Sequence, residues 1–365
     1  MSRPQYAALL AEKTERLRRM LAPFDAPEIE VFPSAETGYR MRAEFRIWHE
    51  GSRISYAMFE PGKKAGSASL IRLERFAPAA GAINRLMPVL LEALSADSVL
   101  KERLYQCEFL TALSGETLVC LIYHKKLDEA WQAAARTLEG SLNIRIVGRS
   151  RGQKIVLSQD YVTETLTVHG ETFSYRQTEG SFTQPNARIC EKMLEWACDR
   201  VGHGNRDDLL ELYCGNGNFT LPLSRRFGRV LATEVSKTSV AAARWGIAAN
   251  RADNIALARL SAEEFAQALV GERRFRRLEE QQIELSDYRF STILIDPPRA
   301  GVDEGSLKTV AQFDRIIYIS CNPDTLCANL AALNRSHRIR AAALFDQFPH
   351  TPHIESGVFL ERRAA

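Results

Sequence analysis

The chain has 365 residues, of which 45% are hydrophobic and 25% charged, and its net charge is +3. These values are ordinary for a globular protein: they exclude a disordered or strongly charged chain, and the length suffices for two domains with separate cores. Apolar runs stay below the roughly 18 residues that cross a membrane, and residues 1–5 lack the apolar core of a signal peptide. We therefore expect a cytoplasmic protein without a membrane segment.

The cysteines are scattered. They stand at positions 107, 120, 190, 198, 214, 321 and 327, and no two form a Cys-x-x-Cys pair. This pattern indicates neither a disulfide framework nor a metal site, so we expect free thiols and no metal.

The first half of the chain predicts an α+β domain over residues 1–180. An amphipathic helix is expected at 5–22, and alternating polarity from residue 39 predicts a strand with one basic face. That face carries Arg40, Arg42, Arg46 and Trp48, which is compatible with a solvated sheet surface and with an RNA-contacting surface. Further strands are expected at 55–60, 104–113, 117–123 and 143–147, with helices at 80–95 and 128–139.

The second half, residues 181–365, alternates strands and helices strictly and predicts a doubly wound, mostly parallel sheet. Seven strands are expected, at 208–213, 229–234, 255–260, 291–295, 315–319, 339–346 and 356–361. The charged segment 271–288 is expected to be a solvated helix rather than a binding arm.

A glycine turn follows the first of these strands. Gly215 and Gly217 let the backbone pass close to a ligand, and Glu234, at the end of the next strand, suits ribose hydroxyls. There is no third glycine and no Lys-Ser/Thr pair, so a dinucleotide or triphosphate loop is disfavoured. The alternative is an ordinary strand-to-helix turn that binds no ligand. S-adenosylmethionine, which has no phosphate, fits the pattern better than a dinucleotide or a triphosphate.

Asp296 ends another strand and is followed by Pro297, Pro298 and Arg299. The two prolines enforce a rigid loop at the carboxyl edge of the sheet, where ligands bind in this architecture; the alternative is that Asp296 only caps the next helix. Adenine-N6 methyltransferases have an aromatic residue where Arg299 stands, so methylation of an amino group is less favoured.

Cys321 follows the next strand and is the cysteine best placed to meet a bound donor. A thiolate that adds to C6 of uracil makes C5 nucleophilic, and a base must later remove the C5 proton. Glu355, directly before the last strand, is the candidate base. The alternatives without a catalytic role are that Cys321 is a small buried residue and that Glu355 is a surface glutamate. His350 and His353 are weaker candidates for the base.

Five motifs in this order resemble the RNA uracil-C5 methyltransferases, most closely the tRNA branch, over essentially the whole chain. They are the segments 181–186, 212–219, 296–299, 320–323 and 353–355. The resemblance implies a Rossmann-like class I methyltransferase domain behind an RNA-binding domain. It implies methylation of uridine 54 in the T-loop of tRNA, with the equivalent uridine of transfer-messenger RNA (tmRNA) as a further candidate.

The same resemblance implies roles for individual residues. Cys321 is then the nucleophile and Glu355 the proton acceptor, and five residues contact S-adenosylmethionine: Gln184, Tyr213, Asn218, Glu234 and Asp296. Arg46, Tyr105 and Arg299 are implied to contact RNA, and a monomer is expected.

Three alternatives stay open from sequence alone. A 23S ribosomal RNA uracil-C5 methyltransferase is the alternative within the family, but many of those members carry a four-cysteine cluster that this chain lacks. A small-molecule methyltransferase would methylate free uridine, and a non-catalytic RNA chaperone would not need Cys321.

Overall fold

The computed structural model describes residues 3–202 and 207–364, which fold into two compact units. The large unit comprises residues 3–36, 166–176 and 188–364, and the small unit comprises 37–165 and 177–187. The structure therefore divides the chain differently from the expected boundary between residues 180 and 181. Residues 29–32 pair with a strand near the carboxyl end of the chain, which draws the amino-terminal segment into the large unit.

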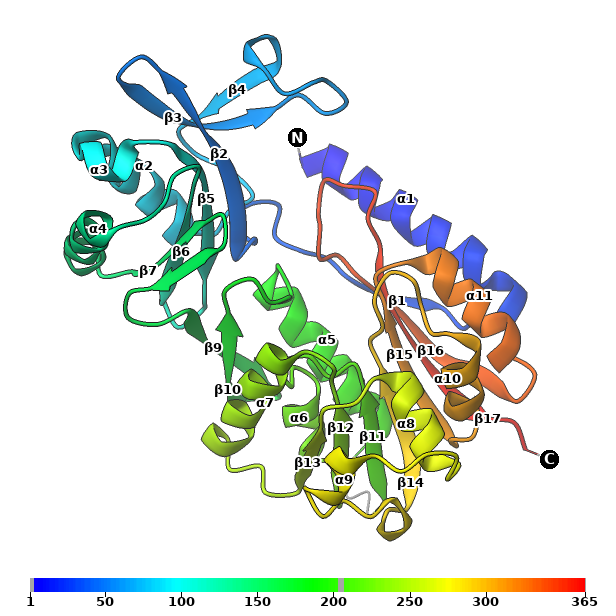
Figure 1. Cartoon of the computed structure of the whole chain (residues 1–365). Helices are drawn as coiled ribbons and strands as arrows, with labels where there is room; N and C mark the ends of the chain where they lie inside the picture. The colour runs from blue at the N-terminus through cyan, green and yellow to red at the C-terminus, as the bar shows by residue number, and fades with distance from the viewer. Residues whose placement is uncertain (1–2, 203–206, 365) are drawn as a thin grey trace. The chain divides into compact units, whose positions relative to one another are not determined.

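The large unit is built on an eight-stranded sheet (Figure 1). Its order is β1 (Ile29–Phe32), β16 (His337–Phe345), β17 (Glu355–Arg362), β15 (Arg315–Ser320), β14 (Phe290–Ile295), β11 (Asp208–Leu212), β12 (Val230–Thr233) and β13 (Ile255–Ala258). Only β17 runs antiparallel to its neighbours among these strands. The seven expected strands and the mostly parallel sheet are confirmed, and β1 is an additional strand.

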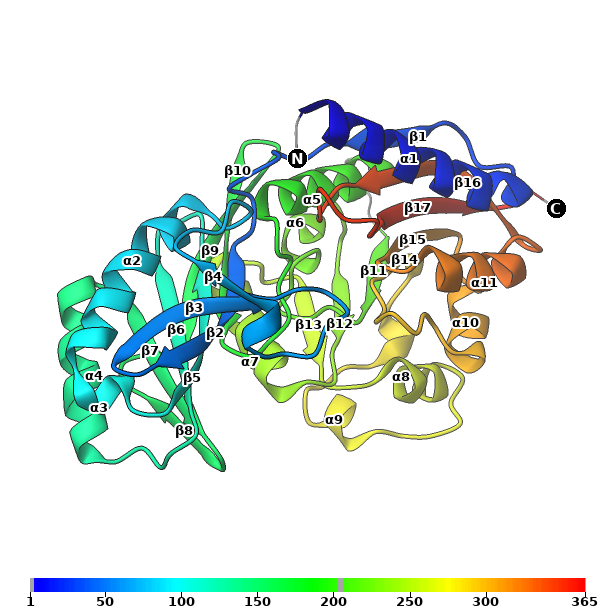
Figure 2. The same ribbon diagram turned by 90° about the horizontal axis from the view of Figure 1, so that it is seen from above.

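Helices cover both faces of this sheet (Figures 1 and 2). One face carries α1 (Arg3–Leu21), α8 (Ala262–Leu269), α10 (Glu304–Val310) and α11 (Pro323–Leu333), whose apolar residues join the main core. The other face carries α5 (Ala187–Val201), α6 (Thr220–Ser224) and α7 (Lys237–Ala249). The 3-10 helix η1 (Ala22–Phe24) ends α1, and α1 lies against β1 and α11.

Segment 271–288 is not the solvated helix that its charges suggested. It holds only the short helix α9 (Arg276–Glu279) and the 3-10 helix η3 (Leu285–Asp287). Phe275, Leu278 and Ile283 are buried in the main core, while the arginines between them remain largely exposed. The three apolar side chains anchor the segment, so its basic residues are presented from a fixed backbone.

The small unit is an α+β domain, as expected. Its sheet runs β4 (Leu70–Leu73), β3 (Arg53–Phe59), β2 (Arg42–Glu50), β5 (Leu104–Thr111), β6 (Thr117–Tyr123), β7 (Arg145–Ser150) and β8 (Gln153–Val156). Helices α2 (Gly81–Ala96), α3 (Ser98–Lys101) and α4 (Glu129–Leu142) pack on one face, and η2 (Ser67–Ser69) precedes β4. The hairpin of β9 (Tyr161–Val168) and β10 (Glu171–Thr178) forms a separate two-stranded sheet.

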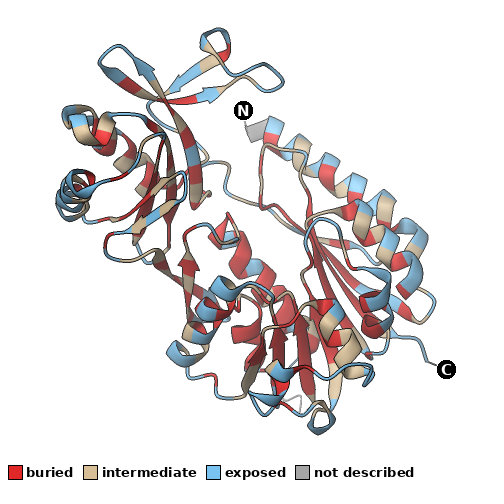
Figure 3. Ribbon diagram, viewed as in Figure 1, coloured by how far each residue is buried: buried red, intermediate tan, exposed pale blue. Residues whose placement is uncertain are grey.

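The alternation expected in β2 is confirmed. Ala43, Phe45 and Ile47 are buried in the core beneath the helices, whereas Arg46 and Trp48 are only half-buried on the opposite face. Figure 3 shows the burial of the strands of both units as colour along the ribbon. Strand geometry alone separates the two sets, because successive side chains point to opposite faces.

None of the helices within residues 3–202 and 207–364 is both long and apolar enough to cross a membrane.

Candidate donor and thiol site

Strand register brings most of the expected site residues of the large unit to one edge of its sheet. Leu212 pairs with Thr233 on one side and with Ile295 on the other, so Tyr213, Glu234 and Asp296 follow three neighbouring strands. Ser320 pairs with Ser356 across the antiparallel β15 and β17. Cys321 leaves β15 at the point where Glu355 enters β17, so the thiol and the carboxyl group share this edge.

The glycine turn holds Glu234 in place. Tyr213, Gly215 and Gly217 all have positive φ, at 60°, 57° and 86°, which bends the chain sharply after β11. The Glu234 carboxylate accepts a hydrogen bond from the Gly215 amide at 3.0 Å and another from the Ser236 amide at 2.7 Å. Its position is thereby fixed beside the turn, as a group that binds ribose hydroxyls requires.

Asn218 lies at the end of the same turn and is half-buried. Its side-chain amide contacts the Cys190 thiol at 3.3 Å, and its backbone carbonyl accepts a hydrogen bond from the Tyr175 hydroxyl at 3.1 Å. Cys190 therefore acts as a buried packing residue, as expected, and it helps to orient Asn218.

The loop after β14 is tied to the loop that carries the thiol. The Arg299 carbonyl accepts hydrogen bonds from the Asn322 side-chain amide at 3.0 Å and from the Thr325 hydroxyl at 3.3 Å. Asn329 also binds both backbone groups of Val302, at 3.1 and 3.0 Å. These contacts couple the position of Asp296 to that of Cys321 through two rigid loops.

Cys321 differs from the other cysteines in its surroundings. Five of the seven are buried, and only Cys321 and Cys327 are half-exposed. The Cys327 thiol is directed at the Met20 carbonyl of α1, 3.5 Å away. Cys321 is thus the accessible thiol at the edge of the sheet where Glu234 and Asp296 lie.

The acids around Cys321 govern its protonation. Burial, and after it the negative charges of Glu355 and Asp296, raise the pKa of the Cys321 thiol to about 11, while a backbone hydrogen bond at Cys321 and the charge of Arg299 lower it. Glu355 is 4% exposed, and burial together with Asp296 raises its pKa well above the usual range. A pKa of about 11 keeps the thiol protonated at neutral pH, and burial favours the neutral form of Glu355.

Two more carboxyl groups extend this acidic cluster. Burial raises the pKa of Asp296 to about 7 and that of Glu211 on β11 to about 8. One Glu211 oxygen has no hydrogen-bond partner among the described residues. Sequence reasoning missed Glu211, although a lone acid inside the apolar run of β11 was the available signal.

Such a cluster fits a cationic ligand. S-adenosylmethionine carries a sulfonium and an ammonium group, and a positive charge beside these acids would favour their ionised forms. Glu234 would hold the ribose of this ligand.

The expected RNA-contacting residues of the small unit are adjacent. The Arg46 guanidinium lies over the Tyr105 ring at 3.5 Å from its centroid, and Tyr105 stacks on His124 with centroids 4.0 Å apart. Arg46 and Tyr105 are half-buried and His124 is exposed. Arg299 belongs to the large unit and is exposed there.

Gln184 is not among the residues that the sheet edge assembles. It lies in segment 177–187 of the small unit, and its side-chain oxygen is buried without a partner among the described residues. Its contact with the methyl donor remains a prediction.

The small unit also gathers Glu108, Cys120 and Glu179, whose side-chain ligand atoms lie within 4.8 Å of one another. Glu179 already pairs with Arg149 at 2.7 Å and with Lys154 at 3.3 Å. These ion pairs offset the charge of the Glu179 carboxylate, and Lys154 also pairs with Asp160 at 2.7 Å.

Comparison with known proteins agrees with this geometry. The family model described as tRNA (Uracil-5-)-methyltransferase matches residues 5–363. A tRNA/tmRNA (uracil-C(5))-methyltransferase of Neisseria meningitidis serogroup C / serotype 2a is 61% identical over 98% of this chain and 97% of its own length. One of Acinetobacter baylyi is 57% identical over 98% of each chain. The crystal structure of Pyrococcus abyssi tRNA (uracil-54, C5)-methyltransferase with S-adenosyl-L-homocysteine has a TM-score of 0.72 at 20% identity and covers 97% of this chain and 83% of that chain.

The fold of the large unit is that of a Rossmann-like class I methyltransferase, because an open, mostly parallel sheet carries a glycine turn after β11 and an acid after β12, at the carboxyl ends of these strands. Within that class, the chain belongs to the tRNA (uracil-5-)-methyltransferase family.

Proposed function

We propose that this protein transfers a methyl group from S-adenosylmethionine to C5 of uridine 54 in the T-loop of tRNA. The observation that carries the proposal is the accessible Cys321 thiol beside the buried Glu355, at the sheet edge that also holds Glu234 and Asp296. Membership of the family and the names of the relatives support this substrate.

The reaction begins at the thiol. The Cys321 thiol gives its proton to water, the sulfur adds to C6 of uracil and forms a C–S bond, and the electron pair of the C5–C6 double bond passes into an enolate. S-adenosylmethionine supplies a methyl group on a cationic sulfur when it is bound. C5 takes this methyl group as the bond from methyl carbon to donor sulfur breaks.

Glu355 completes the reaction. As a carboxylate it removes the proton from C5, the C5–C6 double bond re-forms, and the thiolate leaves C6. The raised pKa of Glu355 suits a proton acceptor, because a more basic carboxylate removes a carbon-bound proton more readily. Glu355→Gln is expected to slow turnover by roughly 10²- to 10⁴-fold, while Glu361→Gln on the same strand leaves it unchanged.

The RNA must be remodelled for this chemistry, since a base inside a folded loop has to be splayed out to reach the thiol. The small unit acts as the RNA-binding domain, in which Arg46 and Tyr105 contact the T-arm. Arg299, beside Cys321, lies near the target base. Gln184, Tyr213 and Asn218 join Glu234 and Asp296 in binding the donor.

The names of the relatives extend the substrate range to tmRNA, which carries a T-arm-like element. The protein acts in the cytoplasm, where these RNAs are found, and it acts as a monomer, because one chain holds both the donor site and the thiol.

Methylation of an unmodified tRNA transcript with labelled donor tests the proposal. The label should appear as 5-methyluridine at position 54, and a transcript with cytidine at that position should remain unlabelled. Label elsewhere in the RNA, or equal turnover on free uridine, would refute the assignment.

A further inference from the structure

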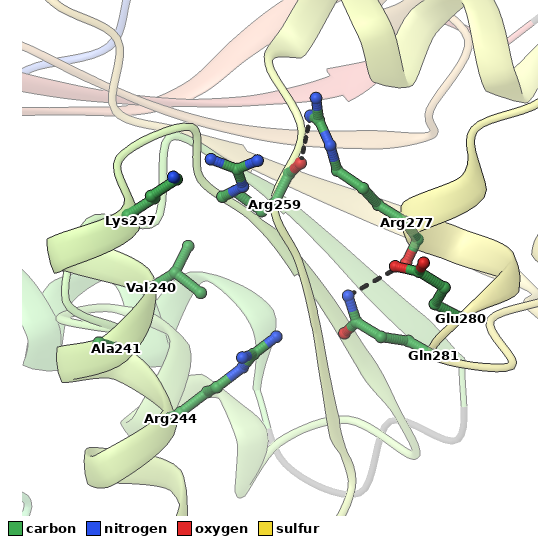
Figure 4. A pocket seen from close by; sticks show the side chains of 8 residues that line it. All are labelled: Lys237, Val240, Ala241, Arg244, Arg259, Arg277, Glu280 and Gln281. Atoms are coloured by element: carbon green, nitrogen blue, oxygen red, sulfur yellow. Dashed lines mark hydrogen bonds between the residues drawn. The ribbon is translucent and has the colours of Figure 1, made fainter.

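A basic pocket lies beside the free edge strand of the large sheet. It has a volume of about 340 Å³ and is lined by α7, by Arg259 after β13 and by the segment that contains α9 (Figure 4). Its charged residues are Lys237, Arg244, Arg259, Arg277 and Glu280. None of them has a part in the chemistry assigned to Cys321 and Glu355.

Three cations in this pocket are available to a ligand. The pairs that the structure shows are Arg277 with Glu264 at 3.1 Å and Glu280 with Arg276 at 2.8 Å. Within the described part of the chain, the side chains of Lys237, Arg244 and Arg259 have no acid within salt-bridge distance. The pocket therefore holds an excess of positive charge that the described residues do not neutralise.

The walls of the pocket are fixed. The Arg277 guanidinium donates to the Arg259 carbonyl at 2.8 Å, and the Gln281 side-chain amide donates to the Arg277 carbonyl at 3.1 Å (Figure 4). Leu278 is buried in the main core and anchors the same segment. The first turn of α7 adds its partial positive charge near Lys237, because the amide groups of a helix start point outward.

We infer that this pocket binds a backbone phosphate of the RNA substrate, outside the site that holds the methyl donor. Guanidinium and ammonium groups donate charge-assisted hydrogen bonds to phosphate oxygens, and a fixed backbone holds them in position for this contact. The inference rests on the proposed function, since it takes the RNA as the substrate. It adds a second RNA contact, in the unit that carries the thiol.

The double variant Lys237→Glu/Arg244→Glu tests the inference with full-length tRNA. KM for tRNA is expected to rise by roughly tenfold or more, and the slope of log KM against log salt to fall by about 1, because the slope changes by about one unit for each phosphate that is no longer neutralised. The kcat at saturating tRNA and the affinity for S-adenosylmethionine should not change. Arg335→Glu is the control, since Arg335 is also exposed and lies before β16, which β17, β15, β14, β11 and β12 separate from β13 in the strand order, and so far from the pocket.

An unchanged KM and salt slope in the double variant would overturn the inference. A parallel loss of affinity for S-adenosylmethionine would also overturn it, because the pocket would then belong to the donor site. Wild-type protein that fails to methylate uridine 54 would instead refute the proposed function. The two failures are therefore distinguishable.

Discussion

The Cys321 thiol lies among groups that oppose its ionisation. Burial, Glu355 and Asp296 raise its pKa to about 11, although a hydrogen bond from the backbone of Cys321 and the charge of Arg299 act in the other direction. The chain therefore holds its nucleophile in the neutral form until a positive charge or a base is present. Such an arrangement limits side reactions of the thiol in the free protein.

Alkylation by iodoacetamide checks this property. In a Cys327→Ser background without donor, modification of Cys321 should rise by about tenfold per pH unit between pH 7 and pH 9, because only the thiolate reacts. Mass spectrometry of the Cys321 peptide gives the rate. A plateau near pH 7 would show that another group lowers the pKa.

Glu211 gives a second prediction, which concerns stability. Burial raises its pKa from 4.5 to about 8, so between these values the folded state binds more protons than the unfolded state. The stabilisation is complete below pH 4.5 and is lost as the pH rises through 8. Each pKa unit corresponds to about 1.4 kcal/mol, so the loss amounts to a few kcal/mol.

Glu211→Gln removes this ionisation and keeps the side-chain volume. Thermal melting should show that the variant gains stability relative to wild type as the pH rises from 5 to 9. Parallel pH profiles for the two proteins would contradict the assignment of a buried, neutral Glu211.

Among the elements, α1 has a structural role that reaches the site. Lys13 and Asp346 form a buried ion pair at 2.7 Å, with side chains 3% and 1% exposed. Lys13 also donates to the Phe348 carbonyl at 2.9 Å, and the Tyr6 hydroxyl donates to Asp346 at 2.8 Å. The helix thereby fixes the loop between β16 and β17, which ends at Glu355.

Lys13→Met should destabilise the protein by roughly 3–5 kcal/mol, since it leaves the Asp346 charge buried without a partner. Urea denaturation measures the change. Lys192→Met, which breaks an exposed pair with Glu195, should change stability by less than about 1 kcal/mol. Equal effects of the two substitutions would show that the buried pair contributes no more than a surface pair.

Regular patterns allowed the elements to be predicted. Apolar runs and turns located all seven carboxyl-terminal strands, and alternation in β2 separated its buried from its half-buried side chains. The four-residue β1 was missed because such a run has too few residues to show a period. The apolar anchors of segment 271–288, such as Phe275, were missed because irregular spacing gives no helical stripe.

The site was predicted where a residue ends a strand. Tyr213, Glu234, Asp296 and Cys321 could be placed on one edge because parallel strands share their direction. The buried ion pair of Lys13 could not be predicted from the sequence, because its partner Asp346 lies 333 positions away. The signal was Lys13 itself, a lone charge on the face of α1 that Leu17 and Leu21 bury.

At the scale of the whole molecule, the two units interrupt each other in the sequence. The large unit needs residues 3–36 and 166–176, which precede the expected boundary at residue 181. Leu17, Leu21 and Ile29 from the first of these segments are buried in its main core.

A fragment of residues 181–365 should therefore fail to fold cooperatively, because it removes β1 from the outer edge of β16 and uncovers the core face beneath α1. Circular dichroism during thermal unfolding measures this. A sharp transition at the melting temperature of the full chain would show that the amino-terminal segment is dispensable.

The most direct test of the central claim is covalent trapping with a T-arm RNA that carries 5-fluorouridine at position 54. Fluorine at C5 cannot leave as a proton does, so methylation should stop at the adduct between sulfur and C6. Denaturing electrophoresis and peptide mass spectrometry should show a protein–RNA complex linked through Cys321, and Cys321→Ser should form none. An adduct that persists in Cys321→Ser, or that maps to another residue, would contradict the mechanism.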